Sequence, residues 1–419
     1  MFGEQILTTG WKVHDILAAQ RGVAKEETSR ILQHVSSICT KRCSRCPSWY
    51  HPLQIKSFSE RGQTSAGTLQ AGLGVTPNMS VRSTISSALE RGIEFLASRQ
   101  GSDGLWRDFL TPAGEASLWP TGFIGTALQA AGPREGALRR AAAALIAHQD
   151  SAGGWGYNEN VPCDADSTAC ALLFLAHVEC PRDTRQRAVL CLQSHQRSDS
   201  GGIATFREPG PIRQFMGVGR WMRFDGWCQP LTEVTALAGR ALATLGCGSG
   251  ETTLHAAWQF VRTRQRADGS WTSYWWPSPH YATLQAVELA LLMGDDRCAR
   301  LAGGWALRSQ TGDGAWDMPN EPNSAFATAL CLSILVKVRA NPTAIARATR
   351  QLAAMQDVDG GWPSHPILRI PMPGLVDPEK RRPWPLGSRG AAVVISDQYR
   401  TFTSAACVTA LAAARCAAE

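Results

Sequence analysis

The sequence predicts an all-α fold in which six outer and six inner helices form a closed, double-layered barrel. One phrase recurs along the chain: Gln, three or four residues, Gly, one residue, then Trp. Its copies are about 46 residues apart and carry no strand pattern, which predicts two helices per repeat. The two helices differ: the first is amphipathic with arginines on its polar face, and the second is apolar on nearly every face. The second set should therefore be buried inside the first.

The repeated phrase occurs in five full copies and one worn copy, in which Ile203 replaces Trp. Glycine permits a backbone reversal after the first helix, so we expect these residues to be scaffold and not catalytic. One interval of 68 residues predicts an insertion of about 20 residues in the third repeat, within 206–230. The copies are Gln100-Gly104-Trp106, Gln149-Gly153-Trp155, Gln196-Gly201-Ile203, Gln265-Gly269-Trp271, Gln310-Gly314-Trp316 and Gln356-Gly360-Trp362.

The repeats define the expected helices in order. A closed ring of six pairs would need no capping repeats. The outer helices are expected at 84–100, 133–149, 183–196, 251–265, 298–310 and 343–356, and the inner helices at 121–131, 167–177, 232–245, 282–292, 324–336 and 401–414.

Composition limits the function classes. The chain has 419 residues, of which 44% are hydrophobic and 18% charged, so it can bury a large core. It contains no apolar run long enough to span a membrane and no signal-peptide pattern at residues 1–18. Cysteines within apolar helical runs indicate reduced thiols and a cytoplasmic protein. The net charge of +7 suits an anionic small ligand or a peripheral membrane contact, and it is too mild for a nucleic-acid binder.

Residues 1–80 lie outside the repeat, and we expect an N-terminal extension there. Cys39, Cys43 and Cys46 have the spacing of a radical-SAM iron–sulfur loop, but the barrel of strands and helices that such a loop requires does not follow. A zinc or other metal site and an incidental basic tail are the other interpretations, and we favour the tail. Met79 offers an alternative natural start just before the first repeat helix.

The first repeat carries the fullest motif, Arg91-Gly92-x-x-Phe95-Leu96-x-x-x-Gln100-x-x-x-Gly104-x-Trp106. It resembles the QW motif of squalene–hopene cyclases, oxidosqualene cyclases and related class II terpene cyclases. The resemblance covers residues 81–419 and implies an α6–α6 toroid, the single β-type domain of terpene cyclases. Protein prenyltransferase β-subunits share this toroid, so the repeat alone leaves the function open.

Two carboxylates, Asp164 and Asp166, begin the second inner helix. One Asp and Ser167 are explained by helix capping, but two Asp exceed what a cap needs. In a dry cavity, mutual repulsion and desolvation would raise one pKa and keep a proton available. The segment resembles the D-x-D-D motif of class II cyclases, which implies that Asp166 is the proton donor. Asp164 matches the first Asp, and Ser167 stands where the third Asp usually is.

The sequence departs from the hopene cyclases at a second point. In that family a His on the next inner helix tunes the acid, whereas Leu237 stands here and Glu233 lies nearby. Tuning is then expected from Glu233, Asn158, His280 or water. This difference favours a shorter or aromatic-linked prenyl substrate over squalene.

Aromatic and polar residues near the starts of inner helices are candidates for substrate binding, because aromatic faces stabilise carbocations. An aromatic packing cluster is the alternative for the same residues. The candidates are Trp119, Ser167, Trp227, Glu233, Trp275, Trp276, His280, Tyr281 and Phe326.

The insertion also carries arginines, and Arg213, Arg220 and Arg223 are candidates for binding a diphosphate. A solvated loop is the ordinary alternative. We also expect the insertion and the basic stretch at 380–400 to cover the mouth of the cavity.

The leading interpretation is a class II terpene cyclase, an isomerase that protonates a polyprenyl substrate through Asp166 and closes rings through carbocations. The substrate is expected to be a prenyl diphosphate or a prenylated aromatic. No metal or cofactor is expected for protonation, and Mg²⁺ is expected only with a diphosphate. One alternative is a non-catalytic toroid that binds a prenylated intermediate or partner. A second is a prenyltransferase-like β-subunit, but Asp397 and Cys407 are too far apart to supply its zinc site.

Overall fold

The computed structural model describes residues 77–132, 134–246, 251–387 and 390–418. The predicted extension at 1–80 falls almost wholly outside these residues, as do Cys39, Cys43 and Cys46. The first helix, α3 (Pro77–Ser98), begins slightly ahead of the predicted boundary at residue 81.

Six apolar helices form a closed inner ring. Each contacts the next along the chain, and the last contacts the first, so the ring has no free edge. They are apolar on nearly every face because neighbours cover them on all sides. These helices are α4 (Leu118–Ala131), α6 (Ala165–Leu175), α9 (Thr232–Thr244), α11 (His280–Leu292), α13 (Ala325–Lys337) and α15 (Thr401–Ala418).

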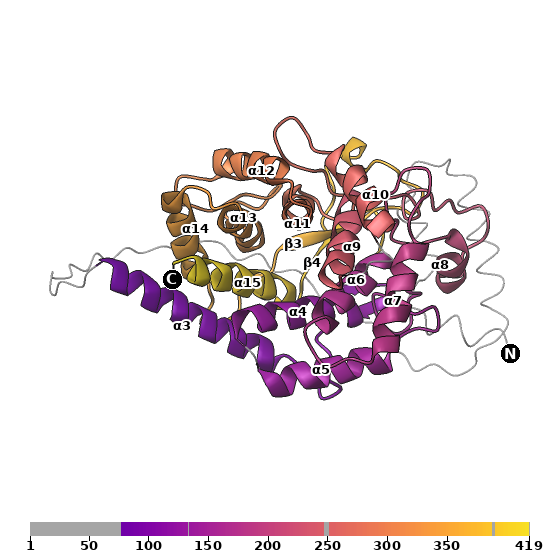
Figure 1. The fold of residues 1–419 in the computed structure, drawn as a ribbon, viewed down its shortest axis with the longest axis horizontal. Coiled ribbons are helices and arrows are strands. Elements are labelled where there is room, and N and C mark those ends of the chain that lie inside the picture. The colour runs from indigo at the N-terminus through magenta and orange to yellow at the C-terminus, as the bar shows by residue number, and fades with distance from the viewer. Residues whose placement is uncertain (1–76, 133, 247–250, 388–389, 419) are drawn as a thin grey trace, which may run out of the picture.

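Six further helices surround this ring, and Figure 1 shows them at the periphery of the inner set. Each packs against inner helices, and α14 also contacts α3, which closes the outer layer. The predicted α6–α6 toroid is therefore confirmed. The outer helices are α3, α5 (Glu135–Ala147), α7 (Arg182–Ser194), α10 (Glu251–Arg262), α12 (Asp296–Ser309) and α14 (Pro342–Ala354).

The Gln-Gly-Trp turns connect each repeat to the next. In all six copies the Gln Nε2 donates to the carbonyl of the repeat's own Gly, at 2.7 to 3.2 Å. It also donates to a carbonyl in the following outer helix, at 2.8 to 3.0 Å. The Gly of each copy has a positive φ between 75° and 99°, which only glycine adopts without strain.

The Trp of each full copy binds its own outer helix. Its buried Nε1 donates to the carbonyl ten residues earlier, at 2.6 to 2.9 Å. In the last repeat, the Nε2 of Gln356 reaches the carbonyl of Ala88 in α3, so the same bond that joins neighbours also closes the ring.

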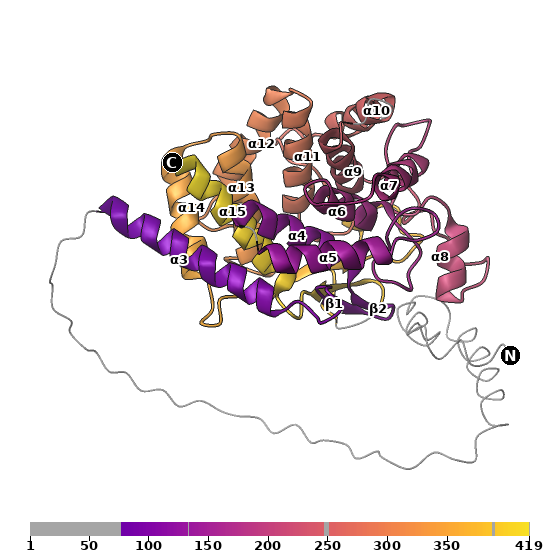
Figure 2. The same ribbon diagram turned by 60° about the horizontal axis from the view of Figure 1, so that its bottom comes forward.

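Short elements gather at the end of the toroid where the inner helices begin, and Figure 2 shows β1, β2 and α8 beside the helical layers. The sequence showed no strand pattern, because strands of three to five residues leave too short a periodic signal. The insertion in the third repeat contains a short helix. These elements are β1 (Asp108–Thr111) with β2 (Gly114–Ala116), β3 (Pro366–Ile370) with β4 (Val393–Ser396), α8 (Pro209–Met216) and the 3₁₀ turn Pro378–Lys380.

The opposite end of the inner ring holds an ion-pair network. The carboxylate of Glu288 lies 2.5 Å from a guanidinium nitrogen of Arg240 and 2.9 Å from the Nζ of Lys337. Arg240 also donates to Gln285. Three inner helices, α9, α11 and α13, are tied together by these charges. Across the part of the chain that the structure describes, every helix is too short or too polar to cross a membrane.

Candidate active site

An apolar cavity opens at the end of the toroid where the inner helices begin. The empty space within it, including open solvent at its mouth, is about 840 Å³. Both strand pairs, the insertion and the starts of three inner helices, α4, α6 and α11, contribute to its wall. The lining residues are Thr111, Ala113, Trp119, Tyr157, Val161, Asp164, Asp166, Ser167, Thr205, Phe206, Ile212, Phe215, Trp227, Trp275, Trp276, Tyr281, Leu368 and Ile370.

The two aspartates of the second inner helix have different environments. Asp164 is the N-cap of α6: its Oδ1 accepts from the backbone N–H of Ser167 at 2.7 Å, and its Oδ2 accepts from the Ser167 hydroxyl at 2.8 Å. Burial raises the pKa of Asp164 to about 6, although the hydrogen bonds from Ser167 oppose the shift. The capping role is therefore filled by Asp164 and Ser167 together.

Asp166 lies two residues further on, in the first turn of α6, and is less restrained. Among the described residues, the Thr205 hydroxyl donates to Oδ2 of Asp166, at 3.4 Å. Burial raises the pKa of Asp166 well above its usual value, and repulsion from Asp164 and Glu233 raises it further. The hydrogen bond from Thr205 opposes this shift only in part. The environment thus favours a protonated carboxyl on the cavity wall.

Thr205 is itself oriented by an aromatic residue. The Nε1 of Trp275 donates to the Thr205 hydroxyl oxygen at 2.9 Å, and the backbone N–H of Ala165 donates to the Thr205 carbonyl at 3.0 Å. Because its oxygen accepts the indole hydrogen, the hydroxyl hydrogen is free to point at Asp166. A Trp–Thr–Asp chain of hydrogen bonds therefore runs along the wall.

Glu233 lies behind the wall and not in it. It is buried, and its Oε1 accepts from the backbone N–H groups of Tyr274 and Trp275, at 2.5 and 2.8 Å. Burial raises the pKa of Glu233, and those hydrogen bonds oppose the shift. Glu233 therefore holds the aromatic segment in place and adds negative charge near Asp166.

Stacked rings form much of the cavity lining. Trp276 stacks on Tyr281 with ring centroids 4.0 Å apart, and it lies 6.1 Å from Trp119. Trp227 and Trp275 are 5.5 Å apart. These five rings, all predicted to bind substrate, share one cavity with both aspartates and Ser167.

Two other predicted aromatic residues lie outside the lining. Phe326 is stacked behind Trp276, with centroids 5.4 Å apart. His280 is buried, with its Nδ1 2.9 Å from the Ser278 hydroxyl and its ring 5.2 Å from Trp305. Burial lowers the pKa of His280 to about 4, so the ring is neutral at neutral pH.

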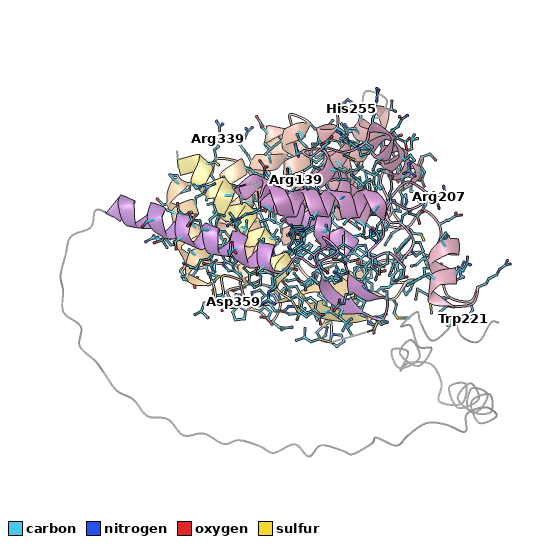
Figure 3. All side chains as sticks on the ribbon, turned by 90° about the horizontal axis from the view of Figure 1, so that it is seen from below. Arg139, Arg207, Trp221, His255, Arg339 and Asp359 are labelled. Carbon is cyan, nitrogen blue, oxygen red and sulfur yellow. The ribbon has the colours of Figure 1, made fainter. Side chains whose placement is uncertain are left out.

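The three arginines predicted to bind a diphosphate do not line the cavity. Arg213 packs its guanidinium 5.2 Å from the ring of Phe224, and Arg223 is exposed and paired with Asp225 at 2.5 Å. Arg220 is also exposed. Figure 3 shows the neighbouring Trp221 at the outer edge of the molecule, on the same side as Arg207.

The sequence analysis missed several lining residues, notably Tyr157 and Thr205. Both stand two residues after the Trp or Ile of their repeat. Their shared position within the repeat could therefore have identified them from the sequence. The hairpin residues Thr111, Leu368 and Ile370 had no such signal, because short strands were not expected there.

Asp397 and Cys407 do not form the zinc site of a prenyltransferase. Asp397 accepts from the backbone N–H groups of His365 and Thr403, while the Cys407 thiol lies 3.8 Å from the Ala325 carbonyl. Among the described residues, neither belongs to a cluster of side chains that could hold a metal ion.

Comparisons with known proteins identify the class. No protein-family model matches the chain. A squalene–hopene cyclase from Bradyrhizobium diazoefficiens is 27% identical over 241 residues, which are 50% of this chain but only 36% of that relative. An ent-copalyl diphosphate synthase from Streptomyces platensis, 20% identical with a TM-score of 0.53, shares the fold.

Similarity is greater to the type II terpene cyclase MstE from Scytonema. The apo structure is 30% identical with a TM-score of 0.71, covering 79% of this chain and 98% of MstE. MstE complexes with geranylgeranyl dihydroxybenzoate as substrate and with merosterolic acid A as product give TM-scores of 0.73 and 0.74, each at 29% identity, covering 81% of this chain and 99% of MstE. The chain therefore belongs to the class II (type II) terpene cyclases, as the resemblance of its QW motif and its Asp164–Ser167 segment implied.

Proposed function

We propose that this chain cyclises a prenylated aromatic compound, with Asp166 as the acid that starts the reaction. The observation that carries the proposal is the position of Asp166: a carboxyl with a raised pKa and no cation among the charges that act on it, on the wall of an aromatic cavity. A neutral carboxyl in a water-poor cavity is a suitable donor to an alkene, which is a weak base.

The reaction would begin with transfer of the Asp166 proton to a terminal alkene of the prenyl chain. The π electrons form the new C–H bond and leave a tertiary carbocation, and the next alkenes attack in turn to close the rings. Loss of a proton to a base or to water ends the sequence and makes the reaction an isomerisation. Asp166 is left as a carboxylate and regains its proton from solvent.

Hydrogen bonding would direct this proton. Thr205 donates to Oδ2 of Asp166, so the acidic hydrogen resides on Oδ1. Trp275 fixes the direction of the Thr205 hydroxyl. Thr205 and Trp275 are therefore positioning residues for the acid, in place of the His expected in hopene cyclases.

The aromatic wall would stabilise the cations that follow. Ring faces attract a positive charge, and this attraction strengthens when water is excluded. Trp119, Trp276 and Tyr281 pack together in the lining, so their ring faces would stabilise positive charge on a prenyl chain that occupies the cavity.

Two observations support a prenylated aromatic over a prenyl diphosphate. MstE, whose structure matches 81% of this chain, binds geranylgeranyl dihydroxybenzoate as its substrate. The arginines expected to bind a diphosphate lie outside the cavity lining.

The test is incubation of the purified chain with geranylgeranyl dihydroxybenzoate and, separately, with geranylgeranyl diphosphate and Mg²⁺. We expect a cyclic product from the first, and loss of that product in Asp166→Asn. Asp183→Asn, an exposed aspartate on α7, is the matched control and should leave the yield unchanged.

Three outcomes would contradict the proposal in different ways. Undiminished product in Asp166→Asn refutes the acid assignment. Conversion of the diphosphate alone refutes the substrate class. Tight binding of both compounds without turnover indicates the non-catalytic toroid.

A further inference from the structure

A second group of reactive side chains lies outside the cavity, near the start of α6. The ligand atoms of Cys163, Cys191 and His195 all fall within 4.8 Å of one another. Cys163 belongs to the loop that enters α6, while Cys191 and His195 lie at the C-terminal end of α7. Residues four apart share one face of a helix, so both α7 side chains face the loop cysteine.

The spacing of the two sulfurs fits a metal ion. The Sγ atoms of Cys163 and Cys191 are 3.8 Å apart. In a tetrahedral zinc site with Zn–S bonds of about 2.3 Å, two sulfurs stand about 3.8 Å apart. A disulfide would require them to approach to about 2.05 Å.

The third member is the imidazole of His195, which is hydrogen-bonded to the Cys163 thiol. The Nδ1 of His195 lies 3.1 Å from the carbonyl oxygen of Ala204. A carbonyl only accepts, so Nδ1 carries a ring hydrogen, and Nε2 is the nitrogen that a metal would take as its ligand. Metal-binding histidines are typically oriented in this way, with the second nitrogen donating to a backbone carbonyl.

The surroundings leave room for a fourth ligand. A surface groove runs past the three side chains, and its lining includes the carboxylates of Asp150 and Glu159. Cys191 and His195 are buried and Cys163 is half-buried, so the site opens to the groove on the side of Cys163. Water or a carboxylate from the groove would complete a tetrahedron.

We propose that Cys163, Cys191 and His195 bind a Zn²⁺ ion. Binding releases the two thiol protons, and the two thiolates then neutralise the charge of the ion, which suits a largely buried site. The ion would join the loop before α6 to the end of α7. Cys163 directly precedes the N-cap Asp164, so this clamp would hold the turn that carries the aspartates.

The site is separate from the cavity but shares a wall with it. Val161 and Phe206 line both the groove and the cavity. The metal therefore lies outside the chamber where the acid acts, and its role would be structural. The proposal stands on the three ligands and does not depend on the proposed substrate.

The test is metal analysis of the full chain with Zn²⁺, followed by titration with Co²⁺ as a spectroscopic probe. We expect one tightly bound zinc per chain, and thiolate-to-cobalt charge-transfer absorption. Cys163→Ser and His195→Asn should each weaken metal affinity by at least about 100-fold. Cys180→Ser, which changes a buried cysteine ahead of the opposite end of α7, is the matched control and should bind as the wild type does.

The N-terminal cysteines require their own control. A variant with Cys39→Ser, Cys43→Ser and Cys46→Ser should keep the zinc and the cobalt spectrum. Loss of the metal in that variant, together with retention in Cys163→Ser, would overturn the proposal by assigning the metal to the N-terminal segment.

A measurement on the wild type guards against variants that fail to fold. Zinc should protect Cys163 and Cys191 from alkylation, as read by peptide mass spectrometry, while leaving Cys416 reactive. Equal labelling with and without zinc would overturn the proposal. A Cys163–Cys191 disulfide in the metal-loaded, reduced protein would also overturn it.

Discussion

The two ends of the inner ring both bury carboxylates, and they give them opposite properties. Where the inner helices begin, Asp166 is surrounded by aromatic rings and acted on by two further carboxylates, and its pKa is raised. Where they end, burial alone would raise the pKa of Glu288, but Arg240 and Lys337 outweigh it and the pKa is lowered.

The difference shows that burial alone does not decide the charge of a carboxyl in this fold. One end combines desolvation with like charges and stores a proton. The other combines desolvation with cations and keeps a fixed ion pair that holds helices together. The candidate acid and the ion pairs that hold inner helices together thus lie at opposite ends of the same ring.

The largest expected effect comes from Asp166→Asn. Removal of a general acid should lower kcat by about 10²- to 10⁴-fold. The free energy of unfolding should stay the same or rise, because Asn avoids the cost of taking up a proton on folding that a carboxyl with a raised pKa incurs. Turnover assays and urea unfolding on the same sample check this. Parallel loss of stability and activity would contradict it and give Asp166 a structural role.

Glu288→Gln should have the reverse profile. Loss of one partner from a buried ion pair leaves Arg240 and Lys337 uncompensated, and the free energy of unfolding should fall by about 3 kcal/mol. The kcat of the folded enzyme should change little. Glu94→Gln, in an exposed pair with Arg134, is the control and should cost less than about 1 kcal/mol. Equal losses of unfolding free energy in Glu288→Gln and Glu94→Gln would show that the Glu288 ion pairs do not hold α9, α11 and α13 together.

The dependence on pH should separate the two ends. Activity needs protonated Asp166, so it should fall about tenfold per pH unit above the raised pKa of Asp166. The pKa of Glu288 is lowered, so its contribution to stability is present above its unfolded pKa and is lost as pH falls through the folded value. Activity is then lost at high pH because Asp166 loses its proton, and at low pH because the protein unfolds. Activity that rises with pH through neutrality would contradict the acid assignment.

The aromatic wall should give a smaller effect. Trp276→Leu removes a ring face from the cavity, and the loss of about 1–2 kcal/mol of cation stabilisation should lower kcat by about 5- to 30-fold and alter the product mixture. Phe326→Leu, directly behind Trp276, should chiefly lower stability. A change of products in Phe326→Leu but not in Trp276→Leu would reverse the assignment of the wall.

The smallest expected effect is that of Thr205→Val. Loss of one hydrogen bond of about 1 kcal/mol should lower kcat about fivefold with little change in KM. The alkaline limb should move to higher pH, because that hydrogen bond lowers the pKa of Asp166. Thr205→Ser should restore both values. An unshifted limb in Thr205→Val would show that Thr205 does not position the acid.

The fold was predictable because its determinant is local and repeated. Each Gln-Gly-Trp turn satisfies groups within its own repeat and in the next, so six copies specify the ring. The choice between cap and acid was not predictable from residues alone, since Asp164 and Asp166 are both consistent with either role. The structure assigns the cap to Asp164 through the two hydrogen bonds that Ser167 donates to it, and the acid role of Asp166 stays a prediction.

Other parts of the site depend on contacts between repeats, which the sequence does not reveal. Thr205 reaches Asp166 from the next repeat, and Phe326 is hidden by Trp276 from the one before. Cys163 and His195 are far apart in the sequence and meet only because the loop before α6 packs on the end of α7.

The closing bond of the ring has a consequence for how the chain folds. Gln100 reaches Ala137 across 37 residues, whereas Gln356 reaches Ala88 across 268. By the logarithmic cost of loop closure, the longer connection costs about 2 kcal/mol more entropy. The repeats should therefore assemble stepwise as an open arc, with the seam between α14 and α3 forming last. Since the cavity is lined from Thr111 to Ile370, we expect it to be complete only after that seam has closed.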